Sequence, residues 1–193
     1  MTEWSSSKQA ARLKGRTARQ GVPAEERSGY AAAVAERLLA LPEIAAAHTI
    51  LAYAATPEEI DPAPAIAALR ERGVVIALPR VAGPQRLTLH RVDDDSVLET
   101  GPLGIAEPSE ESPAISPHDV DVAIVPGVAF DGGCRRIGHG SGYYDRLLSR
   151  LGRAVTIGLA FDGQVFSEVP CEDHDVCVDV LITPSRTLRR SRP

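Results

Sequence analysis

The stretch "VDVAIVPGVAFDGGCRRIGHGSGYYDRLL", residues 120–148, carries the clearest signal for the fold. It begins with an apolar run up to residue 131, continues through a loop in which Gly138, Gly140 and Gly142 alternate with other residues, and then reads as a helix from Tyr143. Alternating glycines weaken a strand and supply nothing to a core, so they indicate a sharp turn or a close approach to the backbone. A strand followed by such a loop and a helix is typical of open α/β sheets, in which ligands bind beyond the carboxyl ends of the strands.

Helical and apolar segments alternate on both sides of this stretch. Several apolar segments are continuous, which is typical of strands buried on both faces of a parallel sheet. We therefore predict one α/β domain over residues 1–193 with a mainly parallel sheet, a core at about 5–184 and a disordered tail at 185–193. The polar, proline-rich residues 93–119 are expected to cross the surface and could line a site. The predicted helices are 5–20, 23–41, 62–73 and 143–152, and the predicted strands are 48–55, 74–81, 86–92, 120–131, 154–161 and 178–184.

Composition and charge exclude several classes of protein. Of the 193 residues, 44% are hydrophobic and 24% are charged, which is typical of a globular chain. The net charge of −5 argues against a general nucleic-acid binder. The sequence contains no run of about 18 apolar residues, so no membrane span is predicted. The N-terminus also lacks the apolar core of a signal peptide. We expect a cytoplasmic protein that binds neither nucleic acid nor membrane.

Cys171, His174 and Cys177 are evenly spaced and raise the question of a zinc site. A structural zinc ion needs four ligands, and the sequence offers no fourth candidate nearby. We therefore interpret the cysteines as reduced thiols in a loop before a strand.

The glycine loop has two interpretations. Without side chains at its glycines, the loop could bring backbone N–H groups against an oxyanion such as phosphate. It matches neither the Walker pattern nor a full GxGxxG, so a purely structural turn is the alternative. Asp145 follows in the first helical turn, where it could hold a Mg²⁺ ion beside phosphates or could simply favour the helix start.

A basic stripe marks the first predicted helix. Lys8, Arg12 and Arg16 are spaced four residues apart, which places them along one face. Such a stripe is often only a solvated surface. In a chain that is acidic overall, it could also be a second clamp on a polyphosphate.

Taken together, these motifs resemble the 5-formyltetrahydrofolate cyclo-ligase family, also called methenyltetrahydrofolate synthetases. The resemblance rests on "VPGVAFD", "RIGHGSGYYDR", the basic first helix, "PEEID" after the first strand and "HDVCVDVLIT" near the end, and it runs from about Lys8 to Pro184. It implies a three-layer α/β/α fold like that of ribose-5-phosphate isomerase and CoA-transferase-like proteins. It also implies a ligase that uses ATP and Mg²⁺ to cyclise 5-formyltetrahydrofolate to 5,10-methenyltetrahydrofolate, through phosphorylation of the formyl oxygen and with release of ADP and phosphate.

The resemblance also implies roles for individual residues. Arg136 and Asp145 would be catalytic, Asp145 and Asp175 would hold the metal, and Arg16 lies where it could assist. Glu59 would bind the pterin N–H donors of the substrate together with Gly140, Gly142 and Tyr143, although Glu59 could instead cap the next helix. The residues implied to bind ATP are Lys8, Arg12, Arg136, Ile137, Gly138, His139, Gly140, Ser141, Gly142, Tyr143 and Tyr144.

The chain departs from the family pattern at the start of the loop. The family often has glycine where Cys134 stands, and Gly133 lies one place early, so the turn could be shifted in register. His139 and Ser141 occupy variable positions and are assigned no catalytic role. A monomer acting on small molecules is expected. The alternatives are a non-catalytic nucleotide or folate binder on the same scaffold, and a sugar-phosphate enzyme that needs no ATP.

Overall fold

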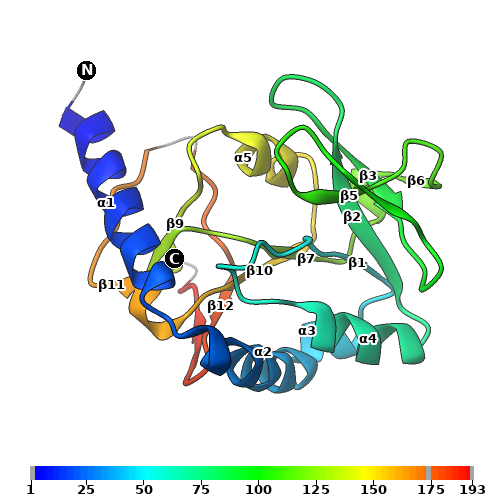
Figure 1. Ribbon diagram of the computed structural model, residues 1–193, viewed down its shortest axis with the longest axis horizontal. Helices are drawn as coiled ribbons and strands as arrows, with labels where there is room; N and C mark the ends of the chain where they lie inside the picture. Colours follow the sequence, from blue (N-terminus) through cyan, green and yellow to red (C-terminus); the bar gives the residue numbers. More distant parts are fainter. Residues whose placement is uncertain (1–2, 173–174, 192–193) are drawn as a thin grey trace.

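The computed structural model describes residues 3–172 and 175–191, and within these ranges one eight-stranded sheet forms the centre (Figure 1). Its order is β13-β12-β10-β7-β1-β2-β3-β6, and all pairs from β12 to β2 are parallel. Toward the two edges of the sheet, β13, β3 and β6 pair antiparallel with their neighbours. The bounds are β1 Thr49–Leu51, β2 Val75–Val81, β3 Leu87–Arg91, β6 Ala114–Ile115, β7 Val122–Val125, β10 Val155–Leu159, β12 Val180–Ile182 and β13 Thr187–Arg189.

Helices cover both faces of this sheet. The helices α2 (Ala24–Leu39), α3 (Pro42–Ala45) and α4 (Ala63–Glu71) pack on one face, and α5 (Tyr143–Leu148) packs on the other (Figure 1). The side chains of each strand alternate between the two resulting cores, because Ile50 and Ile124 point to one and Leu51 and Val125 to the other. The prediction of a three-layer α/β domain with a mainly parallel sheet is confirmed.

The predicted strand 120–131 is two strands, and that part of the prediction is wrong. β7 ends at Val125, and β8 (Ala129–Asp131) belongs to a smaller sheet with β9 (Arg136–Ile137) and β11 (Val165–Phe166). The break falls at Pro126 and Gly127, where the ring of Phe130 folds back so closely that a Cβ on Gly127 would lie 2.3 Å from it. Proline cannot donate to a central ladder, so the chain leaves the main sheet here.

A further difference concerns the tail, which the sequence predicted to be disordered from residue 185. Thr187–Arg189 instead forms the edge strand β13 beside β12. Its Leu188 packs against the core, and Arg189 forms an ion pair with Glu43 at 2.6 Å. Three residues of alternating polarity are too few for a strand to be recognised from the sequence.

Residues 93–119 fold into the hairpin β4 (Leu98–Thr100) and β5 (Ala106–Pro108), then β6 and the short 3-10 helix η1 (Pro117–Asp119). A second 3-10 helix, η2 (Asp162–Gln164), precedes β11. In the described residues, no helix is both long and apolar enough to cross a membrane.

Cys134 shows how the turn between β8 and β9 is made. Its φ of 62° is the left-handed conformation that glycine favours, and its N–H donates to the carbonyl of Asp131 at 3.0 Å. The cysteine therefore adopts a backbone conformation that glycine would take without strain. Its side chain is fully buried, and burial raises the pKa of the thiol to about 11.

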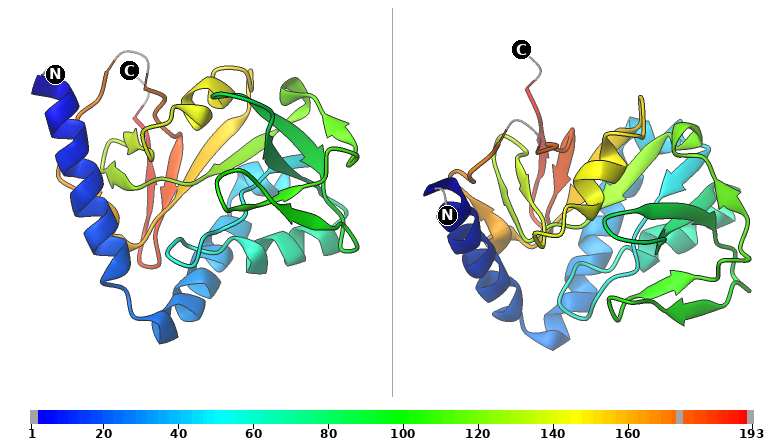
Figure 2. Two further views of the ribbon diagram at one scale, coloured as in Figure 1. Left: turned by 45° about the horizontal axis from the view of Figure 1, so that its top comes forward. Right: turned by 90° about the horizontal axis from the view of Figure 1, so that it is seen from above.

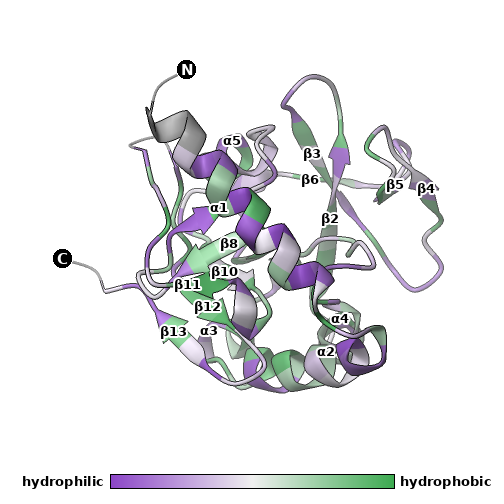
Figure 3. Cartoon of the chain, turned by 60° about the vertical axis from the view of Figure 1, so that its left-hand side comes forward, coloured by the Kyte–Doolittle hydropathy of each residue, from purple (hydrophilic) through white to green (hydrophobic). Residues whose placement is uncertain are grey.

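Helix α1 (Glu3–Gln20) lies apart from the other helices and runs along the flank of the smaller sheet (Figure 2). Figure 3 shows it crossing β8 and β11. The helix comes very close to the chain just before β8 at Gly15, where an added Cβ would lie 2.2 Å from the carbonyl oxygen of Val128. The absence of a side chain at Gly15 thus fixes the distance between α1 and β8.

We predict that Gly15→Ala lowers the free energy of unfolding by about 1–3 kcal/mol, because the added methyl group forces α1 away from β8. The matched control is Gly29→Ala in α2, where nothing lies within 4 Å of the added Cβ. That exchange should stabilise the protein by up to about 1 kcal/mol, since alanine is the better helix former. Chemical denaturation measures both, and equal stability of the two variants would contradict the close contact.

Candidate functional site

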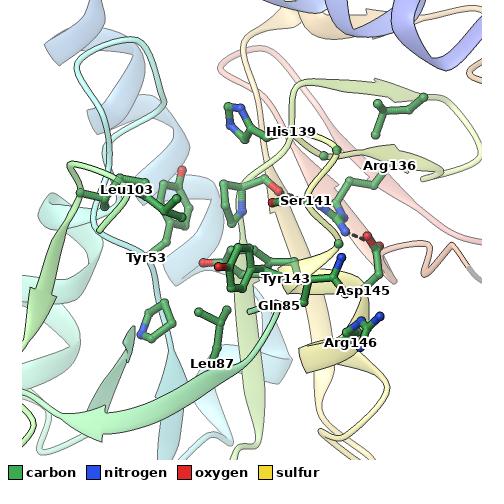
Figure 4. Close-up of a pocket in the computed structure, with 18 of the residues that line it drawn as sticks. Tyr53, Gln85, Leu87, Leu103, Arg136, His139, Ser141, Tyr143, Asp145 and Arg146 are labelled. Atoms are coloured by element: carbon green, nitrogen blue, oxygen red, sulfur yellow. Dashed lines mark hydrogen bonds and ion pairs between the residues drawn. The ribbon is translucent and has the colours of Figure 1, made fainter. Parts of the chain in front are cut away.

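A cleft of about 1150 Å³ opens at the carboxyl ends of β7, β1 and β2. The chain leaves β1 toward β2 on one side of the sheet, and β7 lies on the other side of β1, so the strand order reverses between β1 and β7. Such a switch point is where open α/β sheets bind ligands. Side chains from the glycine loop and α5 face those from the segment after β1, from β2 and from the β4–β5 hairpin across this cleft (Figure 4).

Two of the loop glycines lie against neighbouring arginines, and two have backbone conformations that favour glycine. A Cβ on Gly138 would lie 2.9 Å from Nη1 of Arg136, and one on Gly140 would lie 3.3 Å from the guanidinium carbon of Arg12. Gly140 and Gly142 also have φ values of 104° and 73°, which favour glycine. The loop is therefore held between two guanidinium groups.

Arg136 and Asp145 form an ion pair at the inner wall of the cleft. Nη2 of Arg136 donates to Oδ1 of Asp145 at 2.6 Å, and Nη1 donates to the carbonyl of Pro126 at 3.3 Å. The Arg136 side chain is only 2% exposed, and its Nε has no partner among the described residues. Asp145 is 26% exposed, so it presents a carboxylate to the cleft that is oriented from behind by Arg136.

Lys8 of α1 lies between two carboxylates of the loop before β12. Its Nζ is 2.6 Å from Oδ2 of Asp175 and 2.7 Å from Oε2 of Glu172. Burial alone lowers the pKa of Lys8, but the hydrogen bonds to Asp175 and Glu172 raise it above its usual value. Lys8 is thus a charged ammonium that ties α1 to this loop.

Glu59 follows β1 and is held on two sides. Its Oε2 accepts from the N–H of Thr56 at 3.0 Å, and its Oε1 accepts from Nη1 of Arg19 at 3.1 Å. His139 of the glycine loop lies 3.4 Å from the same Oε1. Burial raises the pKa of Glu59, but the contacts with His139 and Thr56 and the charge of Arg19 together hold it below its ordinary value. Glu59 is therefore a buried carboxylate that keeps its charge at neutral pH.

Opposite the loop, the cleft has a largely apolar wall. Tyr53 is buried, and its hydroxyl donates to the carbonyl of Ile60. Tyr143 lies across from it, and Leu103 projects from the β4–β5 hairpin with 56% of its surface exposed (Figure 4). Flat apolar rings fit such a wall. Pro79, Val81, Leu87 and Ile105 are further apolar residues of the lining.

The cleft brings together all but one of the residues that the sequence predicted for the site. Arg16 is exposed and is not part of the lining, whereas Arg19, which the sequence analysis missed, is buried beside Glu59. Glu172 and the hairpin residue Leu103 were also missed, although the general expectation that 93–119 lines a site is confirmed. The predicted residues that line the cleft are Lys8, Arg12, Glu59, Arg136, Ile137, Gly138, His139, Gly140, Ser141, Gly142, Tyr143, Tyr144, Asp145 and Asp175.

Of the thiols weighed as zinc ligands, Cys171 and Cys177 are free, and His174 lies outside the described residues. The described part of the chain contains no group of three or more His, Cys, Asp or Glu side chains arranged to hold a metal ion.

Comparison with known proteins gives consistent matches. The model of the 5-formyltetrahydrofolate cyclo-ligase family matches residues 4–184. The chain is 30% identical over 178 residues to the 5-formyltetrahydrofolate cyclo-ligase of Escherichia coli K12, which covers 89% of this chain and 97% of that enzyme.

Solved structures agree. The NMR structure of 5,10-methenyltetrahydrofolate synthetase from Aquifex aeolicus matches with a TM-score of 0.85 at 35% identity, covering 96% of this chain and 94% of that one. A 5,10-methenyltetrahydrofolate synthetase from Mycoplasma pneumoniae, at 23% identity and a TM-score of 0.74 over 92% of this chain and 98% of that one, shares the fold.

We predict that Gly138→Ala weakens ATP binding at least roughly tenfold, because the new methyl group displaces the buried guanidinium of Arg136 and with it Asp145. Isothermal titration with MgATP measures the effect. Gly132→Ala, in the turn before β9 and with nothing within 4 Å of the added Cβ, is the control and should bind normally. Unchanged binding in both variants would show that the loop does not depend on Arg136.

Proposed function

The chain belongs to the 5-formyltetrahydrofolate cyclo-ligase family, which converts 5-formyltetrahydrofolate to 5,10-methenyltetrahydrofolate with ATP, and we propose that the cleft performs this reaction by phosphorylating the formyl oxygen. The observation that supports the proposal is the division of the cleft. One side is a glycine loop flanked by arginines, suited to phosphates, and the other is an apolar wall that ends at a charged Glu59, suited to a pterin.

The proposed chemistry proceeds in two steps. The formyl oxygen attacks the γ-phosphorus, the bond from phosphorus to the ADP oxygen breaks, and N5 acquires iminium character. N10 then attacks the formyl carbon and loses its proton, and the carbon–oxygen bond breaks as phosphate leaves. Phosphorylation matters because it turns a poor leaving oxygen into a good one. The protein's contribution is to align the two substrates and to neutralise charge, since no protein nucleophile is required.

The phosphate side would be formed by α1 and the glycine loop. Arg12 donates through Nε to the carbonyl of Gly138 at 3.0 Å and forms no ion pair with any described residue, so the rest of its guanidinium is available for an oxyanion. Backbone N–H groups of residues 138–142 would bind from the other side. Arg136, being buried behind Asp145, would act mainly by orienting that carboxylate. Lys8 would contribute its charge from beside Asp175.

Magnesium is part of the proposal, with Asp145 and Asp175 as its protein ligands. Both are carboxylates on the cleft lining, and Mg²⁺ commonly takes one or two carboxylates and completes its shell with phosphate oxygens and water. Two protein carboxylates therefore suit Mg²⁺ better than a metal that takes all of its ligands from the protein. When bound, the ion would neutralise charge on the phosphates of ATP.

Further parts of the proposal concern the whole protein. Every residue with an assigned role lies in the cleft of one chain, so catalysis by a monomer on small molecules is expected. The free thiols of Cys134, Cys171 and Cys177 are typical of a reducing compartment such as the cytoplasm.

The direct test is the absorbance of methenyltetrahydrofolate formed from 5-formyltetrahydrofolate. We predict turnover only when both ATP and a divalent ion are present. Omission of ATP and chelation of the metal are the two controls. Equal rates without nucleotide would overturn the proposal, and equal rates after exhaustive chelation would remove magnesium from it.

We also predict that Arg12→Ala lowers the ATP-dependent kcat/KM roughly ten- to hundredfold. The variant loses a charge-assisted contact worth about 1.5–3 kcal/mol when partly desolvated. The KM for the folate should change much less. Arg153→Ala removes an exposed arginine outside the lining and is the matched control. If both variants alter the KM for ATP equally little, α1 does not bind the phosphates.

A further inference from the structure

Arg19, in the last turn of α1, is buried but does not line the cleft. Its side chain is 5% exposed, and its Nε has no hydrogen-bond partner among the described residues. The guanidinium faces two neighbouring carboxylates, with Nη1 at 3.1 Å from Oε1 of Glu59 and Nη2 at 3.5 Å from Oε2 of Glu58. Burying an arginine in this way costs considerable free energy, so the guanidinium is placed where it pairs with Glu59.

Glu59 depends on this partner. Its side chain is 7% exposed, and Thr56 supplies only a neutral N–H. The other charged or titratable groups around it are the exposed Glu58, the half-exposed His139 of the glycine loop, and Tyr53 and Tyr144, whose pKa values rise through burial and the charge of Glu59. Arg19 is therefore the permanent positive charge in contact with Glu59 in the described residues.

The contact with Arg19 leaves Glu59 accessible from the cleft. Arg19 approaches from behind the cleft wall, as its absence from the lining shows, while Glu59 itself is part of that lining. A pterin presents a ring N–H and an amino group side by side, a pair of donors that a carboxylate accepts only when it is ionised and correctly rotated. A protonated Glu59 would offer one acceptor fewer.

We propose that Arg19 is a positioning residue for folate recognition, which holds the carboxylate of Glu59 ionised and turned toward the pterin without itself touching either substrate. The inference rests on the proposed function and deepens it. It gives α1 two roles, with Lys8 and Arg12 directed to the phosphates and Arg19 acting through Glu59 on the folate.

Arg27 offers a control for a merely structural role of Arg19. Its Nη2 donates to the carbonyls of Arg19 at 2.7 Å and Val22 at 2.9 Å, and its Nη1 donates to the carbonyl of Pro57 at 3.0 Å. Arg27 thus fastens the same end of α1 to α2 and to the loop of Glu59, but has no contact with Glu59 itself. Loss of Arg27 should lower the melting temperature without changing folate recognition.

The test compares Arg19→Gln, Arg19→Lys and Arg27→Gln by steady-state kinetics from pH 5.5 to 8.5. For Arg19→Gln we expect the KM for 5-formyltetrahydrofolate to rise about tenfold or more, while the KM for ATP stays within about twofold. The acid limb of kcat/KM for the folate should move to higher pH, because Glu59 then loses the charge of Arg19 and keeps only the contacts with His139 and Thr56 to oppose its burial. Arg19→Lys keeps the charge and should restore part of the loss.

Equal changes in Arg19→Gln and Arg27→Gln, or a rise in both KM values together, would overturn the proposal. If Arg19→Gln does not fold, Arg19→Lys is used for the test instead. A folded lysine variant whose ammonium is displaced from Glu59 but whose KM for the folate and acid limb are unchanged would contradict the inference. Carboxyl ¹³C NMR titration of Glu59 in the wild type and the variants gives a readout that needs no turnover. An inactive wild type would therefore defeat the proposed function, whereas an unchanged titration of Glu59 would defeat the role of Arg19.

Discussion

Helix α1 reaches the cleft only because Gly15 has no side chain. At that residue the helix backbone touches the carbonyl oxygen of Val128, and any larger residue would push the helix away. On an α-helix, residues 8, 12, 15 and 19 lie on one face, since each step turns the chain by about 100°. The contact at Gly15 thus fixes how far Lys8 and Arg12 project toward one end of the cleft and where Arg19 meets Glu59 at the other.

The charges of the cleft are arranged as pairs. Each carboxylate in the described lining has a cationic partner, and these pairs are Glu59 with Arg19, Asp145 with Arg136, Asp175 and Glu172 with Lys8, and Glu107 with Arg80. Pairing lets acidic side chains stay ionised in a partly dry site. It also means that Asp175 could serve the proposed metal only by giving up its contact with Lys8, whose ammonium would then be available to a phosphate oxygen.

The layers of the fold could be predicted from the sequence because strands buried on both faces are continuous apolar runs with helices between them. The break at Pro126 and Gly127 could have been inferred from the proline, but the uninterrupted apolar character of 120–131 outweighed it. On α1, two steps of four residues lead from Lys8 to Arg16, which lies about 80° around the helix from Lys8. Steps of four, three and four residues lead instead to Arg19, which lies on the same face as Lys8. The stripe was thus recognised, but the wrong arginine was placed on its inner face.

The partners of the site residues lay beyond the reach of sequence reasoning for a different reason. Alternating glycines indicate that something comes close to the backbone, and a phosphate was the natural candidate. In the structure, guanidinium groups from Arg136 and Arg12 already occupy the space beside Gly138 and Gly140. One of these arginines comes from two residues before the loop and the other from 126 residues away in the chain, so no local pattern could name both. The glycines hence make room first for contacts within the protein, and the proposed phosphate site rests on the resulting arrangement, in which the loop lies between two guanidinium groups.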